Sequence, residues 1–272
     1  MKKLAIVSSA ALLFAGSAAA QSLSDTASSL TQGWSGSATL GASSATGNSE
    51  SSSISGSIRL GKTVGKWEHL VFGTVFKGSS SIVVEERDET GAVVIDDSTG
   101  FPVRNIVTGD DSDRIALGYQ PKYYWRERTY FFGILDWETD EPANIDSSTR
   151  QVIGIGHKFY NNETGFFSGE AGFGNKNLDQ VFGESIDGGI GYLGLNFVRR
   201  FNDTATFNAD LRADFGDNTF TEIGLGLAFK VAEGMALKIS HFTRNNSDIT
   251  DAGNPLSSSG DSVTSLNLVF DI

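Results

Sequence analysis

Apolar and polar side chains alternate along much of this chain, and the clearest example lies between residues 204 and 215. One face there carries Ala205, Phe207, Ala209, Leu211, Ala213 and Phe215, and the other carries Thr206, Asn208, Asp210, Arg212 and Asp214. A repeat of two is the geometry of a β-strand, whose successive side chains point to opposite faces. The segment therefore predicts a strand with one apolar and one polar face.

The same repeat recurs from Trp34 to the end of the chain. It predicts twelve strands, over residues 34–43, 54–60, 67–77, 114–125, 129–139, 153–159, 167–173, 186–198, 204–215, 222–230, 237–244 and 262–272. The only long apolar run, near the N-terminus, is shorter than the roughly 18 residues of a transmembrane helix. A membrane location would therefore require a closed barrel, which also satisfies every backbone polar group in lipid. We predict an all-β fold, a transmembrane antiparallel up-and-down β-barrel over residues 33–272.

The connections between these strands sort by length. The even-numbered connections are short, at 61–66, 126–128, 160–164, 199–203 and 231–234, and the odd-numbered ones are mostly longer, including 78–113, 140–148, 174–185 and 246–261. Outer-membrane barrels have short periplasmic turns and longer outer loops. A soluble β-sandwich shares the repeat of two but gives no reason for this sorting. The pattern favours the barrel.

The longest stretch without a repeat, residues 78–113, is rich in carboxylates. It contains Glu85, Glu86, Asp88, Glu89, Asp96, Asp97, Asp110, Asp111 and Asp113. We expect a long acidic loop on the outer face, because such a loop is uncommon inside a compact soluble domain. Clustered carboxylates are also calcium ligands, but the spacing matches no EF-hand. We expect a solvated acidic surface and no metal site.

The final segment has one face that is apolar to its last residue. That face carries Leu266, Leu268, Phe270 and Ile272. The segment resembles the C-terminal assembly signal of Gram-negative outer-membrane barrels, although that pattern favours glycine at Asn267 and phenylalanine at Ile272. The resemblance implies that the barrel-assembly machinery is a partner and that these four residues form the barrel-assembly signal.

The N-terminus has the features of an export signal. Lys2 and Lys3 precede an apolar run over residues 4–15, and small residues at 18–20 form a cleavage site before Gln21. We predict a cleaved signal peptide at residues 1–20, a periplasmic lead-in at 21–32, and a location in the outer membrane of a Gram-negative bacterium. The chain has no cysteine, so no disulfide supports the fold.

Composition narrows the partners. The formal net charge is −12, which argues against nucleic acid, because phosphate binding needs basic patches. Only 39% of residues are hydrophobic, and 32 are glycine. This modest hydrophobicity suits a barrel in which every second strand residue faces the lumen. The expected partners are outer-membrane lipid, lipopolysaccharide and small solutes.

Charged residues recur on the polar faces of the predicted strands. The lumen-facing candidates are Arg59, Lys122, Lys158, Glu170, Asp210, Arg212, Asp214, Glu222, Lys230, Lys238 and Arg244. A Lys or Arg facing lipid near the midplane would cost about 2 to 4 kcal/mol, so this face must meet water or opposite charges. Two outcomes stay open, namely a narrow polar pore and a lumen closed by paired charges.

The sequence offers no catalytic constellation. Lipid hydrolases of the outer membrane pair a serine with a histidine, and none of His69, His157 and His241 has the His-x-Ser spacing. No His-Glu-x-x-His, phosphate loop or nucleophile elbow occurs. We expect a protein that is not an enzyme and that uses no cofactor.

Short motifs spread over the chain resemble one known family, the salt-induced outer membrane proteins. The motifs are Thr46-Gly47-Asn48-Ser49, Trp67-Glu68-His69, Lys122-Tyr123-Tyr124, Tyr130-Phe131-Phe132-Gly133, Gly154-Ile155-Gly156 and Pro255. The resemblance implies an outer-membrane β-barrel and a response to salt or osmotic stress. We expect a narrow channel for ions or small solutes. The alternative is a non-conducting structural or adhesive barrel, and a lipid hydrolase or secreted sandwich is less favoured.

Overall fold

The computed structural model describes residues 33–45, 49–88, 92–96, 98, 101–217, 219–246 and 260–272. The predicted signal peptide, the periplasmic lead-in, most of the first turn motif and Pro255 lie outside the described residues. None of the described segments forms a helix long and apolar enough to cross a membrane.

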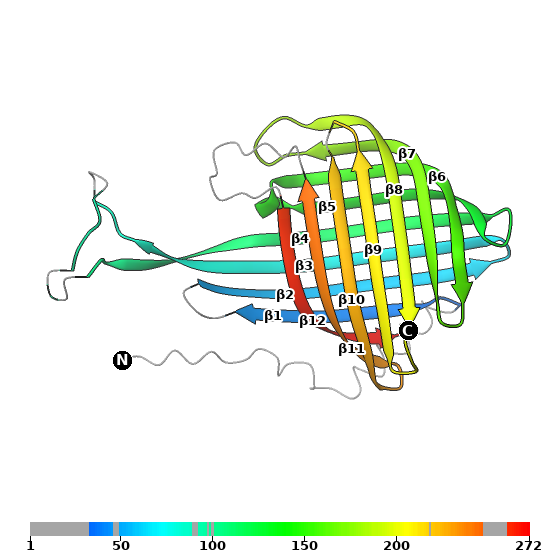
Figure 1. The fold of residues 1–272 in the computed structure, drawn as a ribbon. Helices are drawn as coiled ribbons and strands as arrows, with labels where there is room; N and C mark the ends of the chain where they lie inside the picture. Colours follow the sequence, from blue (N-terminus) through cyan, green and yellow to red (C-terminus); the bar gives the residue numbers. More distant parts are fainter. Residues whose placement is uncertain are drawn as a thin grey trace, which may run out of the picture.

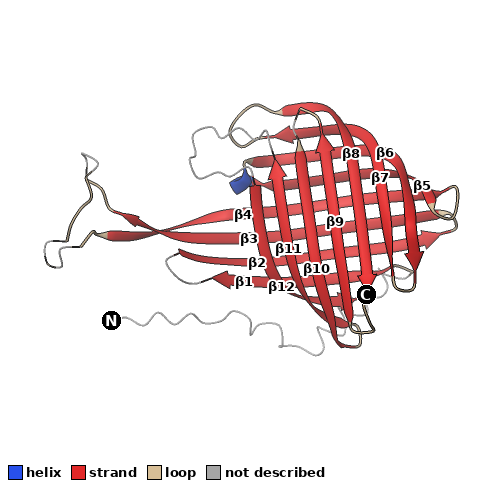
Figure 2. Cartoon of the chain, in the orientation of Figure 1, coloured by secondary structure: helices blue, strands red, loops and turns tan. Residues whose placement is uncertain are grey.

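Twelve antiparallel strands close into one barrel, as the sequence predicted (Figure 1). The strands are β1 (Ser35–Ala45), β2 (Ser49–Val64), β3 (Trp67–Glu85), β4 (Arg104–Tyr124), β5 (Thr129–Asp140), β6 (Ile145–Asn162), β7 (Gly165–Asp179), β8 (Ile186–Arg200), β9 (Ala205–Phe215), β10 (Phe220–Ala232), β11 (Met235–Asn246) and β12 (Gly260–Asp271). Besides them, a 3₁₀ turn, η2 (Glu141–Ala143), follows β5 (Figure 2). Each strand pairs with its sequence neighbours, and β12 pairs with β1.

The last strand closes the barrel against the first. The backbone N–H of Gly36 donates to the carbonyl of Ile272 at 3.1 Å, and the N–H of Ile272 donates back to Gly36 at 2.9 Å. Further along, Asn267 lies opposite Gly41, where an added Cβ would come within 2.0 Å of the asparagine Oδ1. The assembly pattern favours glycine at position 267, but here the glycine is Gly41 on the partner strand. The Asn267 side chain fills the space that the absent side chain of Gly41 leaves.

The exterior of the barrel is apolar. Large hydrophobic side chains point outward at alternate positions on most strands, including Leu40, Ile54, Val75, Leu117, Leu135, Ile153, Phe173, Leu225, Ile239 and Leu266. The assembly-signal residues Leu266, Leu268, Phe270 and Ile272 lie on this surface, from 36% to 51% exposed. Exposed apolar area of this extent on a closed barrel is the surface of a membrane-spanning barrel.

Aromatic side chains gather around one end of this surface. Phe159, Phe167, Phe197 and Phe207 form a chain across β6 to β9, with ring centroids 5.3 to 6.3 Å apart. The short connections 65–66, 125–128, 163–164, 201–204 and 233–234 lie at the same end, which we call the turn end; the opposite end is the loop end. Such a chain resembles the aromatic girdle that lies at a membrane interface.

The acidic stretch 78–113 is not the long loop that the sequence suggested. β3 continues to Glu85 and β4 begins at Arg104, and the two strands stay paired beyond the barrel wall. They form a two-stranded ribbon that extends away from the loop end (Figure 1). β-branched residues at 82–84 and 106–108 favour strand conformation. The many carboxylates in this stretch led to the prediction of a loop.

Two further connections are shorter than predicted. The expected loop 140–148 contracts to residues 141–144, and the expected loop 174–185 contracts to residues 180–185, because β6 and β7 extend past the predicted ends. The connection 216–219 is also short. Sorting by length is therefore weaker than expected. The apolar repeat stops at the edge of the apolar band, whereas backbone pairing continues beyond it.

Candidate functional site

One cavity of about 1700 Å³ occupies the barrel lumen. Its lining includes Ser43 and Ser53 near the loop end, and Glu68 and Asn161 near the turn end. Residues near both ends of the barrel therefore line the cavity, and we take it as the candidate functional site.

Most of the predicted lumen-facing charges line this cavity. They are Arg59, Lys122, Lys158, Glu170, Asp210, Arg212, Glu222, Lys238 and Arg244. Asp214 is fully buried in an ion-pair cluster beside the cavity. Lys230 is solvent-exposed at the turn end of β10, next to a register shift, and does not line the cavity.

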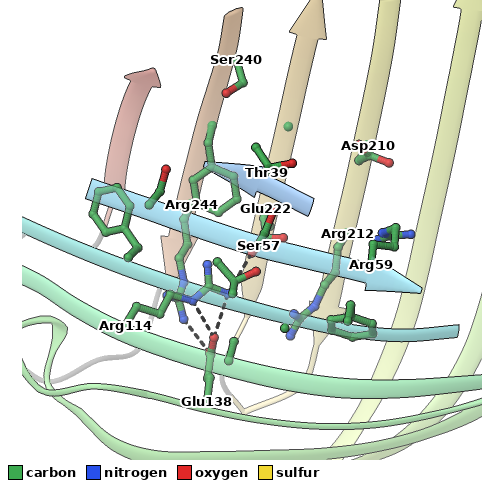
Figure 3. Close-up of a pocket in the computed structure, with 18 of the residues that line it drawn as sticks. Thr39, Ser57, Arg59, Arg114, Glu138, Asp210, Arg212, Glu222, Ser240 and Arg244 are labelled. Atoms are coloured by element: carbon green, nitrogen blue, oxygen red, sulfur yellow. Dashed lines mark hydrogen bonds and ion pairs between the residues drawn. The ribbon is translucent and has the colours of Figure 1, made fainter. Parts of the chain in front are cut away.

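Ion pairs between opposite strands cross the lumen near the loop end. Arg244 on β11 reaches Glu138 on β5 at 2.6 Å, and these strands lie on opposite sides of the ring. Arg114 on β4 contacts Glu138 at 2.9 Å and Glu222, on the opposite strand β10, at 3.6 Å. Figure 3 shows both arginines converging on Glu138. Glu138 thereby joins the two crossings.

A second group of ion pairs lies beside these crossings. Arg150 binds Asp214 at 2.8 Å and also pairs with Asp136, and Arg212 binds Asp214 at 2.9 Å. The Asp214 side chain is completely buried, so its charge depends on the two arginines. We call the charged residues of both groups the loop-end cluster; it comprises Arg114, Asp136, Glu138, Arg150, Arg212, Asp214, Glu222 and Arg244.

The sequence did not single out several members of this cluster. Arg150, Asp136, Glu138 and Arg114 were missing from the predicted set. Arg114 had a signal, since it continues the polar face of Ala116, Gly118 and Gln120 by one step. Arg150 had none, because its strand was predicted to begin after it.

One side of the lumen is a packed core. Tyr130, Phe132, Ile134, Val152 and Ile190 form a buried hydrophobic cluster on β5, β6 and β8, against which Tyr124 and Tyr192 pack. Nearer the loop end, the buried ring of Phe220 has the cations of Lys176, Arg212 and Arg244 within 4.5 to 5.1 Å of its centroid. This half of the lumen is filled by side chains.

Glycines on the inner face make room for these rings. A Cβ added to Gly156 would lie 2.3 Å from the Tyr130 ring, and one added to Gly154 would lie 2.6 Å from the Phe132 ring. Each ring occupies the space that a side chain on the neighbouring strand would otherwise fill. The facing of this aromatic stretch, ambiguous in the sequence, is set by these glycines.

A second cluster of charges lies near the turn end. Glu170 accepts hydrogen bonds from Tyr130 at 2.8 Å and Gln120 at 3.0 Å, and it pairs with Lys122 at 2.9 Å. Next to it, Glu68 accepts a hydrogen bond from Tyr124 at 2.8 Å, and Lys158 lies 3.6 Å away. We call these seven residues the turn-end cluster.

The motifs that carry the family resemblance meet in this region. The four described motifs starting at Trp67, Lys122, Tyr130 and Gly154 lie on the consecutive strands β3 to β6, and their inward residues contribute to the turn-end cluster and to the packed core. Motifs that are weak one at a time in the sequence thus build one connected feature.

The other side of the lumen is lined by short polar side chains. β11, β12, β1, β2 and β3 contribute the cavity-lining residues Ser240, Ser265, Asn267, Thr39, Ser43, Ser53, Ser55, Ser57 and Thr74. They bond to one another, as in the 2.6 Å contact of Ser43 with Ser53 and the 3.0 Å contact of Ser240 with Ser265. Short side chains leave the lumen open along this hydroxyl wall.

Three charges near the hydroxyl wall stand apart from both clusters. Within the described part of the chain, Asp210 forms no ion pair with Arg59 or Lys238, although both cations act on its carboxylate electrostatically. Its hydrogen bonds come from the amides of Asn196 and Asn208. These charges border the open side of the lumen.

The three histidines share the outward-facing register. His69 bonds Tyr119 at 2.7 Å, and His157 bonds Thr129 at 2.9 Å. His241 contacts the hydroxyls of Thr264 at 2.9 Å, Thr243 at 3.2 Å and Ser262 at 3.3 Å.

The chain belongs to the family described as protein of unknown function, DUF481, whose model matches residues 38–272. This description does not mention salt, so a response to salt remains a prediction.

Several solved outer-membrane structures are similar to the chain. The NanC porin is 7% identical with a TM-score of 0.49, over 87% of this chain and 100% of that one. The COG4313 outer membrane channel from Pseudomonas putida F1 is 11% identical with a TM-score of 0.46, over 88% and 95%. The translocator domain of the autotransporter NalP from Neisseria meningitidis is 13% identical with a TM-score of 0.42, over 93% and 94%. No curated protein sequence matches the chain.

Proposed function

We propose that this member of the DUF481 family is an outer-membrane channel that passes ions and small solutes along the hydroxyl wall of its lumen. The lumen cavity, which is lined by residues near both ends of the barrel and lies beside the crossing ion pairs, supports this proposal most directly. Charged and hydroxyl side chains around a narrow lumen set which solutes pass.

The barrel exterior indicates the environment in which the protein functions. The apolar exterior and the aromatic chain at the turn end favour insertion in a bilayer. The predicted signal peptide would export the protein from the cytoplasm, as a location in the outer membrane requires. Outer-membrane lipid, lipopolysaccharide and the barrel-assembly machinery are then its partners in the envelope. A role in salt or osmotic stress would follow if conduction responded to ionic strength.

Thiol labelling offers a direct test, because the chain has no cysteine of its own. The mature protein carrying Ser57→Cys, a lumen position, is refolded and inserted in a planar bilayer, and a charged thiol reagent is added. We expect discrete conductance steps that fall when the reagent reacts. The matched control is Leu135→Cys, a position on the exterior whose labelling should leave the current unchanged. A correctly folded barrel without conductance would overturn the proposal.

A closed structural or adhesive barrel is the second candidate. The ion pairs that join β5 with β11 and β4 with β10 favour it, since they bridge the lumen between opposite walls. The same recordings separate the two functions. If the parent protein is silent and Glu138→Gln conducts, the crossings close the lumen and the closed barrel is correct.

We also propose that the protein is not an enzyme. His241 is the histidine nearest to a serine hydroxyl, but its ring nitrogens contact only hydroxyls among the described residues, and no carboxylate orients the ring. A serine nucleophile needs an oriented general base. Release of fatty acid from phospholipid vesicles by the parent protein, and its loss in His241→Ala, would contradict this.

A further inference from the structure

The lumen face of β3 is unusual for a polar channel. Leu70, Phe72 and Phe76 point inward and line the cavity, while Val71 and Val75 point to the exterior. Inner faces of outer-membrane barrels are usually polar, and apolar side chains belong on the lipid side. The aromatic residues on this inner face therefore need an explanation from inside the lumen.

Phe72 is seated against the barrel wall. Its cross-strand neighbour on β4 is Gly118, and a Cβ added there would lie 2.1 Å from the tip of the phenylalanine ring. The ring thus takes the space of the missing side chain and lies over the wall. Its cross-strand partner on β2 is Arg59, whose guanidinium is 5.9 Å from the ring centroid. Phe72 remains partly exposed and lines the cavity.

Hydroxyl groups lie beside this ring in register. Thr39, Ser57 and Thr74 are cross-strand partners on β1, β2 and β3, and they form a row next to the Arg59–Phe72 pair. The following row on the same face contains Ser55 paired with Phe76. The wall therefore presents an aromatic ring, a hydroxyl row and a second aromatic ring in succession.

This succession matches the surface of a cyclic sugar. A pyranose ring has a face of C–H groups that packs on an aromatic ring, and an edge of hydroxyls that exchanges hydrogen bonds with serine, threonine and arginine side chains. Binding pockets commonly combine an apolar surface with a few placed polar groups in this way. The packed half of the lumen limits the ligand to a narrow shape.

We propose that Phe72, with Arg59 and the Thr39–Ser57–Thr74 row, forms a binding site for small saccharides inside the lumen. The inference rests on the proposed channel function and names its solute class. A saccharide that binds at this site obstructs the narrow path while it is bound. Sugar binding is therefore measurable as an interruption of the ion current.

The experiment uses the mature full chain in a planar bilayer with potassium chloride. Maltotriose is the probe, and sorbitol is its comparison, because sorbitol carries hydroxyls without a ring face. We expect maltotriose to interrupt the current and sorbitol to have no such effect. In Phe72→Ser, the apparent affinity for maltotriose should fall by about tenfold. In Phe72→Leu, the affinity should fall by less.

The matched control is Phe166→Ser, which removes another cavity-lining phenylalanine at the turn end of β7. It should retain maltotriose block. Ion conductance in each variant reports that the barrel has folded. Equal block in Phe72→Ser and the parent, or equal effects of sorbitol and maltotriose, would overturn the sugar site and leave the channel intact. Absence of any ion current would instead overturn the channel function itself.

Discussion

Glu138 on β5 accepts a 2.6 Å hydrogen bond from Arg244 on β11, across the full width of the barrel. The same carboxylate also binds Arg114, which forms a second ion pair with Glu222 on β10. A single carboxylate thus holds together two bridges between opposite walls. Its effect is to divide the loop end of the lumen into a packed side and an open side lined by hydroxyls.

Glu138→Gln should destabilise the barrel and widen the lumen. The substitution leaves the buried Arg244 and the partly buried Arg114 without their shared counter-charge, and breaking a buried pair costs about 3 to 5 kcal/mol. We expect a loss of that order in the free energy of unfolding, measured by urea titration in lipid vesicles, together with a larger single-channel conductance.

The control for this variant is Asp113→Asn. Asp113 forms a 2.9 Å ion pair with Lys77 on the surface, with both side chains at least half exposed. Exposed pairs contribute at most about 1 kcal/mol. Equal destabilisation by the two variants would show that the ion pairs of Glu138 contribute no more to the free energy of unfolding than an exposed pair does.

The double variant Arg59→Gln/Lys238→Gln should shift ion selectivity toward cations. The two removed cations border the open side of the lumen. The Asp210 carboxylate remains there, and its negative charge is no longer offset by Arg59 and Lys238. The measurement is the reversal potential in a potassium chloride gradient. The shift should shrink at high salt, because mobile ions screen charges that are exposed to water. An unchanged reversal potential would place the conducting path elsewhere.

Gly156→Val should weaken the turn-end cluster. A Cβ at this position would overlap the ring of Tyr130, whose hydroxyl binds Glu170. Overpacking of this kind costs about 1 to 3 kcal/mol. Gly133→Ala is the comparison, because its nearest neighbour to an added Cβ is 3.7 Å away. Heat-modifiable migration on gels should change for the first variant and stay normal for the second.

Phe270→Ser should reduce the amount of assembled barrel. Phe270 lies on the exterior of the closing strand, between Ala38 of β1 and Met235 of β11, and belongs to the predicted assembly signal. Phe173→Ser removes an equally apolar exterior residue from β7. Comparing folded protein in outer-membrane fractions separates the two roles. Equal losses would mean that the terminal phenylalanine acts only through its hydrophobicity.

Shortening the ribbon should leave the barrel intact. Residues 83–106 can be replaced by Asn-Gly, a two-residue turn that suits the pair formed by Ile82 and Val107. β2 pairs with β3 only as far as Ile82, so the removed segment has no partner on the barrel wall. We expect the same conductance and unfolding free energy as in the parent protein. A large change in either would assign the ribbon a part in gating or folding.

The candidate site was only partly readable in the sequence. Asp210 and Arg212 were assigned to the lumen because their strand alternates cleanly, and they line the cavity. Phe72 had no decisive signal, since apolar residues occupy both faces of its strand and its facing depends on Gly118 of the next strand. Alternation within one strand cannot report which neighbour leaves space for a ring.

The sequence by itself determined the fold class, the number of strands and the apolar exterior, because a strand exposes its two faces in a repeat of two and lipid selects one of them. It could not determine where strands end beyond the apolar band, which is why the ribbon was mistaken for a loop. Only the tertiary structure decided how the lumen is filled. Glu138 and Arg244 are far apart in the sequence, and closure of the ring alone brings them together.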